Sequence, residues 1–323
     1  MKNRKEYHHA KYNHSRTATI PIVLTGKNNA ERMKEITDKL EQGIKDLFHS
    51  DHYKTYLAAM SKFHNYSFNN TLLIAMQRPD ASLVAGFARW RDSFKRTVKK
   101  GEKGIKILAP SPYTVRRQVE CIDPSTHQTT TEEREIIIQA FKPVTVFDVS
   151  QTEGEALPSI TVDELTGSVE QYGDFFAALE AVSPVPISFE DIPGRSHGYY
   201  HLIEKRIAIQ EGMSDLQTLK TAIHEIAHAT LHAVNPDAAP KDHTDRPDHR
   251  TREVQAESVA YTICQHYGLD TSDYSFGYVA GWSSSKGLSE LKNSLEIIRS
   301  TAHDLISAID NHLEKEDNPD AGI

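Results

Sequence analysis

The sequence predicts an α+β protein of two domains: an N-terminal α+β domain with a small antiparallel sheet, and a C-terminal domain that is mostly helical. Three observations support this prediction. The chain has 323 residues, which is long for a single core. Apolar residues recur at helical spacing near both ends, in residues 29–48 and 288–313, with alternating segments between them. The charge balance also changes sign along the chain.

The charge asymmetry separates a basic front part from an acidic remainder. Residues 1–120 contain 23 Lys and Arg against 11 Asp and Glu, a balance of +12. The remaining residues contain 14 basic and 34 acidic side chains, a balance of −20, which gives the net charge of −8. A basic surface attracts a polyanion and an acidic body repels one. We therefore expect two separate tasks in one chain.

The N-terminal domain begins with three predicted helices, the first two at residues 29–48 and 51–63 and the third between Ser67 and Pro79. Ser67 is a suitable N-cap for the third helix, and Pro79 ends it. Alternating segments after these helices predict strands of a small antiparallel sheet. These strands are expected at residues 105–109, 113–119, 135–141 and 143–149. We interpret the polar stretch 123–133 as a long hairpin loop.

The C-terminal domain is expected to start with a helix at residues 168–181. Three strands are predicted next, at residues 185–189, 198–203 and 206–210. Helical patterns then follow, at residues 216–234, 252–261 and 288–313. The predicted boundaries are a flexible leader 1–28, a first domain 29–150, a linker 151–162, a second domain 163–313 and an acidic tail 314–323.

The stretch from His224 to His228 reads H-E-x-x-H and lies within a predicted helix. Residues four apart share a helical face, so His224 and His228 can present their imidazole nitrogens to one ion. Two His and one carboxylate suit zinc and leave a fourth position for water. Glu225 is then placed to take a proton from that water.

The next helix supplies a third ligand. Glu253 and Glu257 lie four residues apart on one helical face, and buried carboxylates are costly unless paired or bound to a cation. We expect Glu253 to be the ligand, 25 residues after His228. Glu257 would then accept a hydrogen bond from a ligand imidazole, although the two roles can be exchanged. The alternative is a helix pair whose His and Glu residues simply bind one another.

Three further histidines near this motif have no assigned role. His232 extends the series on the first helix by one turn. His243 and His249 lie in the Asp-, His- and Pro-rich stretch between the two helices, and they lack the paired spacing of metal ligands. We interpret these two as polar surface residues.

Composition excludes several classes of protein. The longest apolar run of interest is Leu72–Met76, far shorter than a membrane span, and the polar N-terminus lacks the apolar core of a signal peptide. The two cysteines, Cys121 and Cys264, form no C-x-x-C motif, so a disulfide framework is not expected. The sequence therefore predicts a cytoplasmic protein without a membrane partner.

Residues 86–107, called the basic segment below, place eight Lys and Arg among aromatic residues. Basic side chains replace phosphate counterions and a flat ring accepts any base, as a groove for single-stranded nucleic acid requires. Aromatic and amide side chains near residue 67 offer a second candidate platform. The alternatives are a solvated helix face and ordinary core residues. The candidate DNA contacts are Tyr66, Asn69, Arg89, Trp90, Lys95, Arg96, Lys99, Lys100 and Lys103.

Several spaced motifs, spread over roughly residues 30–310, together resemble the ArdC family of antirestriction proteins of conjugative plasmids and transposons. These motifs are Tyr66–Asn70, Trp90 with Lys100–Ile105, Val146–Gly154, His224–His228 and Val254–Tyr261. The resemblance implies an N-terminal single-stranded-DNA-binding domain and a C-terminal zincin-like metallopeptidase domain.

The C-terminal part also resembles the ImmA/IrrE peptidases, in which a Glu precedes an Ala by three residues on the later helix. Here Glu253 stands three residues before Ala256, which supports Glu253 as the third ligand. The chain departs from those relatives at Glu257, where they often have Asn. The division of roles between Glu253 and Glu257 therefore stays open.

The sequence leads to one main hypothesis and two alternatives. The main hypothesis is an antirestriction-type protein that binds single-stranded DNA and cleaves a protein or peptide substrate with one Zn²⁺ per chain, His224, His228 and Glu253 as ligands and Glu225 as general base. One alternative is a non-catalytic DNA-binding protein with structural zinc. The other is a regulatory protease that cleaves a single repressor.

Overall fold

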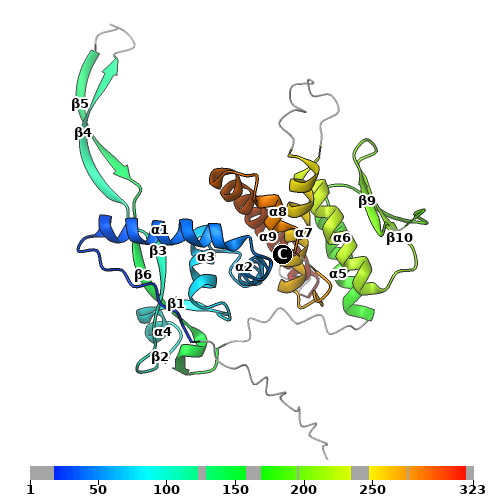
Figure 1. Ribbon diagram of the computed structural model, residues 1–323, viewed down its shortest axis with the longest axis horizontal. Coiled ribbons are helices and arrows are strands. Elements are labelled where there is room, and N and C mark those ends of the chain that lie inside the picture. The colour runs from blue at the N-terminus through cyan, green and yellow to red at the C-terminus, as the bar shows by residue number, and fades with distance from the viewer. Residues whose placement is uncertain are drawn as a thin grey trace, which may run out of the picture.

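The computed structural model describes residues 18–122, 129–157, 169–194, 196–233, 247–274 and 276–317. Figure 1 shows sheet strands and short helices at one end, a central group of long helices including α2, α7 and α9, and a small sheet beside α6 at the other end. The protein is thus a mixed α/β protein with small sheets and a largely helical C-terminal half, which confirms the predicted fold class.

The N-terminal half starts with three helices and continues into short strands. Its elements are α1 (Asn29–Leu47), α2 (Ser50–Lys62), α3 (Phe68–Gln77), β1 (Val84–Gly86), α4 (Phe87–Asp92), β2 (Arg96–Val98), β3 (Ile105–Pro110), β4 (Tyr113–Ile122), β5 (Thr129–Ile138), β6 (Phe141–Asp148), η1 (Val149–Gln151) and β7 (Thr152–Gly154). As predicted, Ser67 caps α3, where its side chain accepts a hydrogen bond from the backbone of Asn70.

The small antiparallel sheet has the strand order β1-β6-β3. Strand β6 lies between β1 and β3, with Ile105 opposite Val146. This register buries Ile105, Ile107 and Val146, while Asn70 of α3 bonds both backbone groups of Leu108. Burial of that apolar face explains why β6 pairs with β3 instead of continuing a meander from β5.

Strands β4 and β5 form a separate two-stranded ribbon that extends away from the helices (Figure 1). The interpretation of residues 123–133 as one long loop was wrong in part, because Thr129 to Glu133 belong to β5. Residues 123–128 lie outside the described part. The described ribbon side chains are largely exposed, including Tyr113 and Ile137 at 52% and 64%.

The packed N-terminal body is longer at both ends than the predicted first domain. Within the expected leader, residues 1–17 are not described, but the backbone of Ile20 bonds Gln77 and that of Thr25 bonds Glu35. Within the expected linker, Gln151 is fully buried and its amide donates to Glu102 and to the carbonyl of Lys103. The body therefore continues to Gly154, and residues 158–162 lie outside the described part.

The C-terminal half combines helices with a three-stranded sheet of order β8-β10-β9, in which β9 is an edge strand and α6 packs against β9 and β10. Its elements are α5 (Val169–Val182), β8 (Ile187–Glu190), β9 (Gly198–His201), β10 (Arg206–Gln210), α6 (Asp215–Leu231), α7 (His249–His266), α8 (Val279–Ser283) and α9 (Leu288–Asp317). The expected tail thus begins inside α9, and residues 318–323 are not described.

The two halves share one core, because α2 packs against α7. The buried Tyr53 hydroxyl lies 2.8 Å from the Ser258 hydroxyl, and the hydroxyl of Thr262 contacts the sulfur of Met60 at 3.8 Å. At the other end of α2, His266 Nδ1 lies 2.8 Å from the carbonyl of Ser61. One face of α7 therefore packs against the N-terminal half, and another face packs against α6.

Candidate functional site

Helix α6 places the two histidines of the H-E-x-x-H motif side by side. Its apolar residues Leu219, Ile223 and Ala227 are buried, which fixes the rotation of the helix and turns His224 and His228 toward α7. The two imidazole Nε2 atoms lie 3.1 Å apart. Two ring nitrogens that converge this closely point to one common binding position.

Helix α7 adds a carboxylate to the same position. Glu253 places Oε2 3.8 Å from Nε2 of His224 and Oε1 3.6 Å from Nε2 of His228. Among the described residues, His224, His228 and Glu253 have ligand atoms that all lie within 4.8 Å of one another. We call these three residues the metal cluster. Two imidazole nitrogens and one carboxylate oxygen fit the donor set of a divalent zinc-type ion.

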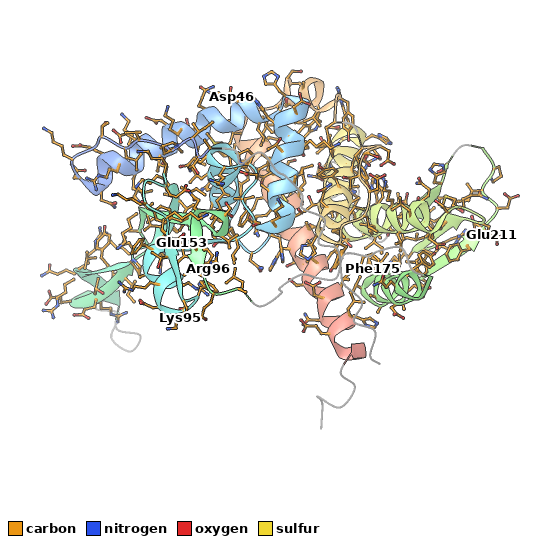
Figure 2. All side chains as sticks on the ribbon, turned by 90° about the horizontal axis from the view of Figure 1, so that it is seen from below. Asp46, Lys95, Arg96, Glu153, Phe175 and Glu211 are labelled. Carbon is orange, nitrogen blue, oxygen red and sulfur yellow. The ribbon has the colours of Figure 1, made fainter. Side chains whose placement is uncertain are left out.

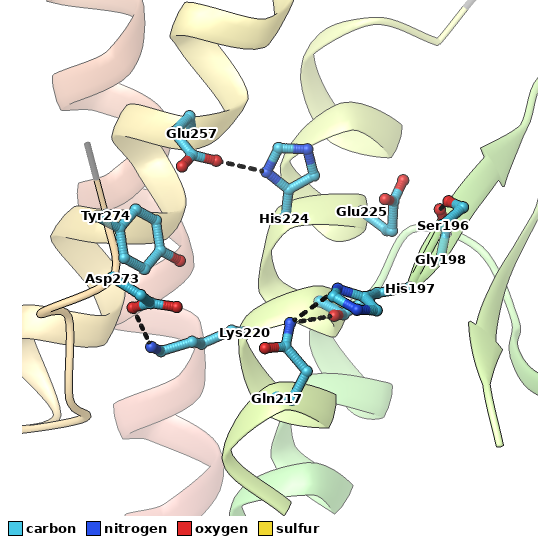
Figure 3. A pocket seen from close by; sticks show the side chains of 11 residues that line it. Ser196, His197, Gly198, Gln217, Lys220, His224, Glu225, Glu257, Asp273 and Tyr274 are labelled. Atoms are coloured by element: carbon cyan, nitrogen blue, oxygen red, sulfur yellow. Dashed lines mark hydrogen bonds and ion pairs between the residues drawn. The ribbon is translucent and has the colours of Figure 1, made fainter. Parts of the chain in front are cut away.

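The second carboxylate of α7 meets a different nitrogen. Glu257 Oε2 lies 3.3 Å from Nδ1 of His224 (Figure 3), whereas Glu253 approaches Nε2 of the same ring. An imidazole that binds a metal through Nε2 carries its proton on Nδ1, and a carboxylate there fixes the ring and its tautomer. The sequence left the roles of the two glutamates open, and the geometry separates them.

The charges of the cluster act on one another through short contacts. Burial opposes protonation of His224, but the hydrogen bond to Glu257 and the nearby charges of Glu225 and Glu257 outweigh it and raise its pKa. The contact with His228 lowers the pKa of Glu253 and keeps it ionised. The pocket is therefore negative around the imidazoles, as a cation site requires.

Glu225 lies between α6 and the edge strand β9, and its side chain is directed toward the strand (Figure 3). It is buried, with 8% exposure, and burial raises its pKa above the ordinary carboxyl value. A backbone hydrogen bond from Tyr200 on β9 stabilises its carboxylate. A fixed carboxylate of raised pKa beside the imidazoles is a stronger proton acceptor than an ordinary carboxylate.

The strand β9 approaches α6 so closely that its first residue must be glycine. A Cβ on Gly198 would lie 2.6 Å from the Thr221 side chain and 2.9 Å from the Ala208 carbonyl. The close approach borders a cavity of about 270 Å³. His224, Glu225 and Glu257 line this cavity together with Lys220, Asp273 and Tyr274. Space for a substrate therefore lies directly beside the candidate reactive groups.

The other histidines near the motif differ in their surroundings. His249 begins α7, and its Nε2 lies 3.7 Å from Glu253 Oε1, although its ring is 79% exposed. His243 lies outside the described residues. His232, to which the sequence analysis gave no role, is buried and contacts His228. The four-residue spacing from His228 was the signal that the sequence offered for His232. Its contact with Gln255 on α7 could not be predicted from that spacing.

Trp90 of the basic segment is a core residue in this structure. Its ring is fully buried, and its Nε1 donates a hydrogen bond to the carbonyl of Phe147 at 2.9 Å. The interpretation of Trp90 as a base-stacking residue was therefore wrong for this conformation. Its ring packs on Phe94 and anchors α4 to β6. Phe87 is instead the exposed aromatic residue, with 52% of its surface accessible and its edge against Phe147.

Part of the basic segment is bound by other groups of the protein, mostly at residues 150–155. Arg96 donates to the hydroxyl and carbonyl of Thr152 and to the carbonyl of Glu155. Lys99 donates to the carbonyl of Ser150 at 2.9 Å, and Lys95 donates to Asp92. Figure 2 shows Lys95, Arg96 and Glu153 close together at the end of the molecule opposite Glu211. These contacts hold β2 against β7.

The remaining candidate DNA contacts face solvent or lie near it. Lys100 and Lys103 are exposed and their ammonium groups make no hydrogen bond or ion pair within the described ranges. Arg89 is exposed over the Phe94 ring, and its charge partly offsets the effect of burial on the pKa of Tyr66, which is raised. Tyr66 donates to the carbonyl of Val84, whereas Asn69 is exposed.

Comparison with known families matches two separate parts of the chain. Residues 27–147 match the N-terminal domain of anti-restriction factor ArdC, and residues 183–267 match the IrrE N-terminal-like domain of the Peptidase_M78 family. The second match includes the metal cluster, Glu225 and Glu257. None of the helices in the described ranges combines the length and apolar character needed to cross a lipid bilayer.

Individual relatives are more distant. An uncharacterized protein of Bacillus anthracis is 29% identical over 318 residues, which cover 88% of this chain and 52% of that protein. The chain thus spans about half the length of this curated relative. The metal-free crystal structure of antirestriction protein ArdC from plasmid R388 is 23% identical, with coverage of 77% and 84% and a TM-score of 0.43. Its Mn(II)-bound structure is 21% identical, with coverage of 81% and 98% and a TM-score of 0.40.

Proposed function

We propose that this chain, which joins an ArdC-type N-terminal domain to an IrrE-like domain of a peptidase family, is a cytoplasmic antirestriction-type protein of a mobile element. In this proposal the N-terminal domain binds single-stranded DNA with little sequence preference. The C-terminal domain hydrolyses peptide bonds of a protein substrate. Joining the two domains raises the effective concentration of the peptidase near proteins on that DNA.

The observation that supports the peptidase most directly is the convergence of the metal cluster beside Glu225 and a cavity. The ligand atoms of His224, His228 and Glu253 face one position, and Glu225 lines the adjoining cavity. Zinc is the metal that we propose, because two imidazoles and one carboxylate leave one coordination position open in a tetrahedral site. Open catalytic zinc sites of peptidases have this composition.

The residues around the cavity have separate tasks in the proposed reaction. When bound, the metal polarises a peptide carbonyl and makes water more acidic. Glu225 accepts the proton of the attacking water and can return it to the leaving nitrogen. The hydrogen bond from Tyr200 holds the Glu225 carboxylate in place for this transfer. The free edge of β9 can pair with the backbone of an extended peptide, which fixes the scissile bond beside the cluster.

The support for DNA binding is the exposed half of the basic segment. Lys100, Lys103 and Arg89 are exposed on the same short region of the fold, while Phe87 offers an accessible ring. Phosphates attract the cationic groups, and an aromatic face stacks on any base. Arg96 and Lys99 are less suitable contacts, because both are occupied by backbone carbonyls and hydroxyls of η1 and β7.

The test of the proposed reaction is Glu225→Gln in the full chain. The amide is isosteric with the carboxylate but accepts no proton, so we expect cleavage of a susceptible peptide or protein to fall by about 10²–10⁴-fold. Metal content should remain at the wild-type level, because Glu225 is not part of the metal cluster. Proteolysis is followed by mass spectrometry of a peptide library, and metal content by elemental analysis.

Glu290→Gln is a matched control, because Glu290 lies on α9 away from the cavity and pairs with Lys286. It should cleave at the wild-type rate. Cleavage that persists in Glu225→Gln would reject the assigned reaction. Protection of DNA from restriction by Glu225→Gln at the wild-type level would favour the non-catalytic DNA-binding alternative.

A further inference from the structure

Behind His228 lies a chain of buried polar side chains that crosses three helices. Nδ1 of His228 on α6 is 3.0 Å from Nδ1 of His232, the residue that caps the C-terminal end of α6, and Nε2 of His232 is 3.0 Å from Oε1 of Gln255 on α7. The amide nitrogen of Gln255 then donates to the hydroxyl of Ser294 on α9 at 3.2 Å. His232, Gln255 and Ser294 are each at most 4% exposed.

The orientation of the Gln255 amide determines which atom donates and which accepts in each hydrogen bond of this series of side chains. Its carbonyl oxygen faces His232, so Nε2 of His232 must carry the proton. A neutral His232 then has its acceptor at Nδ1, which can receive only a proton donated by Nδ1 of His228. A neutral His228 that donates from Nδ1 has its lone pair on Nε2, the atom directed at the metal cluster.

We propose that His232, with Gln255 and Ser294 behind it, is a positioning residue that fixes the tautomer and ring orientation of His228 for metal binding. This inference rests on the proposed metal site. His232 touches no ligand position itself and acts only through His228. The two imidazoles of the cluster are thus oriented by different chemistry: His224 by the carboxylate of Glu257, and His228 by a neutral chain.

Because His232 and Gln255 are not carboxylates, they add no negative charge to the site. The cluster already contains the Glu253 carboxylate and has Glu225 and Glu257 around it. A carboxylate in the buried position that His232 occupies would add negative charge to the site at a large desolvation cost. An imidazole and an amide orient the ligand without that charge, since each link has one donor and one acceptor.

The test compares His232→Leu and His232→Asn in the full chain. Leucine removes the acceptor for Nδ1 of His228, so we expect the affinity for Zn²⁺ and for Mn²⁺ to fall by about 10–100-fold. Asparagine places an amide oxygen near the former Nδ1 atom, so we expect most of the affinity to return. Affinities are measured by competition with a chelator, and the melting temperature of the metal-free protein is recorded for each variant.

Ser258→Ala is the matched control. It removes a buried hydrogen bond, from α7 to Tyr53, on the helix that also carries Gln255. It should lower the melting temperature and leave metal affinity unchanged. If His232→Leu shows no cooperative unfolding, Gln255→Met replaces it, with the same expected direction of change.

The outcomes separate the positioning role from the metal site itself. Wild-type metal affinity in His232→Leu, or equal losses in the leucine and asparagine variants, would overturn the positioning role while the metal site stands. A wild-type protein that binds neither ion would reject the metal site and the positioning role together. A purely structural His232 would lower the melting temperature of both variants without changing either affinity.

Discussion

The metal cluster and the basic segment both gather charged side chains, but they hold them in opposite ways. In the metal cluster each histidine has a partner at its Nδ1 atom: Glu257 for His224 and His232 for His228. In the basic segment, Arg96 and Lys99 use their donors on neighbouring backbone, whereas Lys100 and Lys103 point into solvent. The buried site thus holds its side chains in fixed positions, whereas the exposed segment leaves charged groups accessible to a binding partner.

The difference explains what each region can recognise. Fixed ligand atoms discriminate between ions by distance and coordination number. Mobile ammonium groups on a surface adapt to phosphates at many positions and carry little sequence information. A reaction that requires exact placement and a binding step that tolerates any sequence can therefore coexist in one chain.

The largest effect that we expect comes from Trp90→Ala. Trp90 is fully buried and donates a hydrogen bond to Phe147, so its removal should lower the free energy of unfolding by about 3–5 kcal/mol. Urea denaturation of the full chain measures this value, with the exposed Phe87→Ala as control. If Trp90→Ala kept wild-type stability and lost only DNA binding, Trp90 would be a direct DNA contact after all.

A smaller effect concerns the seam between the two halves. His64 is buried against His266 and His303, and burial followed by the charges of these two rings lowers its pKa to about 4. Since the unfolded state then binds more protons below the ordinary value of 6.5, stability should fall as the pH drops from 6.5 toward 4.

This loss should amount to about 1 kcal/mol near pH 5.5, measured as unfolding free energy across the pH range. His64→Asn keeps a polar side chain but does not titrate, so its stability should change less over the same range. His266 and His303 remain in that variant, as does Asp310, whose Oδ2 lies 4.0 Å from His266 Nε2. Equal pH dependence in both proteins would assign the effect to those groups.

The smallest effect is expected in the basic segment. Each phosphate contact to single-stranded DNA contributes about 0.7 to the slope of log affinity against log salt concentration. Lys103→Ala should therefore reduce the slope by about that amount, whereas Lys99→Ala should change it less, because Lys99 is bound to Ser150. Fluorescence anisotropy with an oligonucleotide at several salt concentrations gives both slopes. Identical slopes in all three proteins would place the DNA elsewhere.

The sequence was most informative where one helix carries the whole pattern. The prediction that His224 and His228 converge needed only helical geometry, and the prediction that Ser67 caps a helix needed only a local capping rule. The choice between Glu253 and Glu257 could not be made in this way, because both lie on one face of α7 and only the packing of α7 on α6 decides which nitrogen each one meets.

Other features depend on contacts between distant segments. Trp90 and the exposed lysines have similar sequence surroundings, and only the pairing of β6 with β1 and β3 shows which side chain is enclosed. His232 contacts Gln255, which lies 23 residues later on α7, and Gln255 in turn bonds Ser294 on α9. The shared core of α2 and α7 was not expected either, because two domains predicted from composition carry no information about how they pack.

The most direct test of the central claim is the metal content of the purified full chain, with zinc and manganese counted per chain. We predict close to one zinc in the wild type, its loss in His224→Ala and Glu253→Gln, and its retention in Glu257→Gln, where removal of one supporting contact weakens affinity by about 10–100-fold without removing a ligand. Absence of metal from the wild type under conditions that preserve bound ions, or a full complement in His224→Ala, would contradict the account.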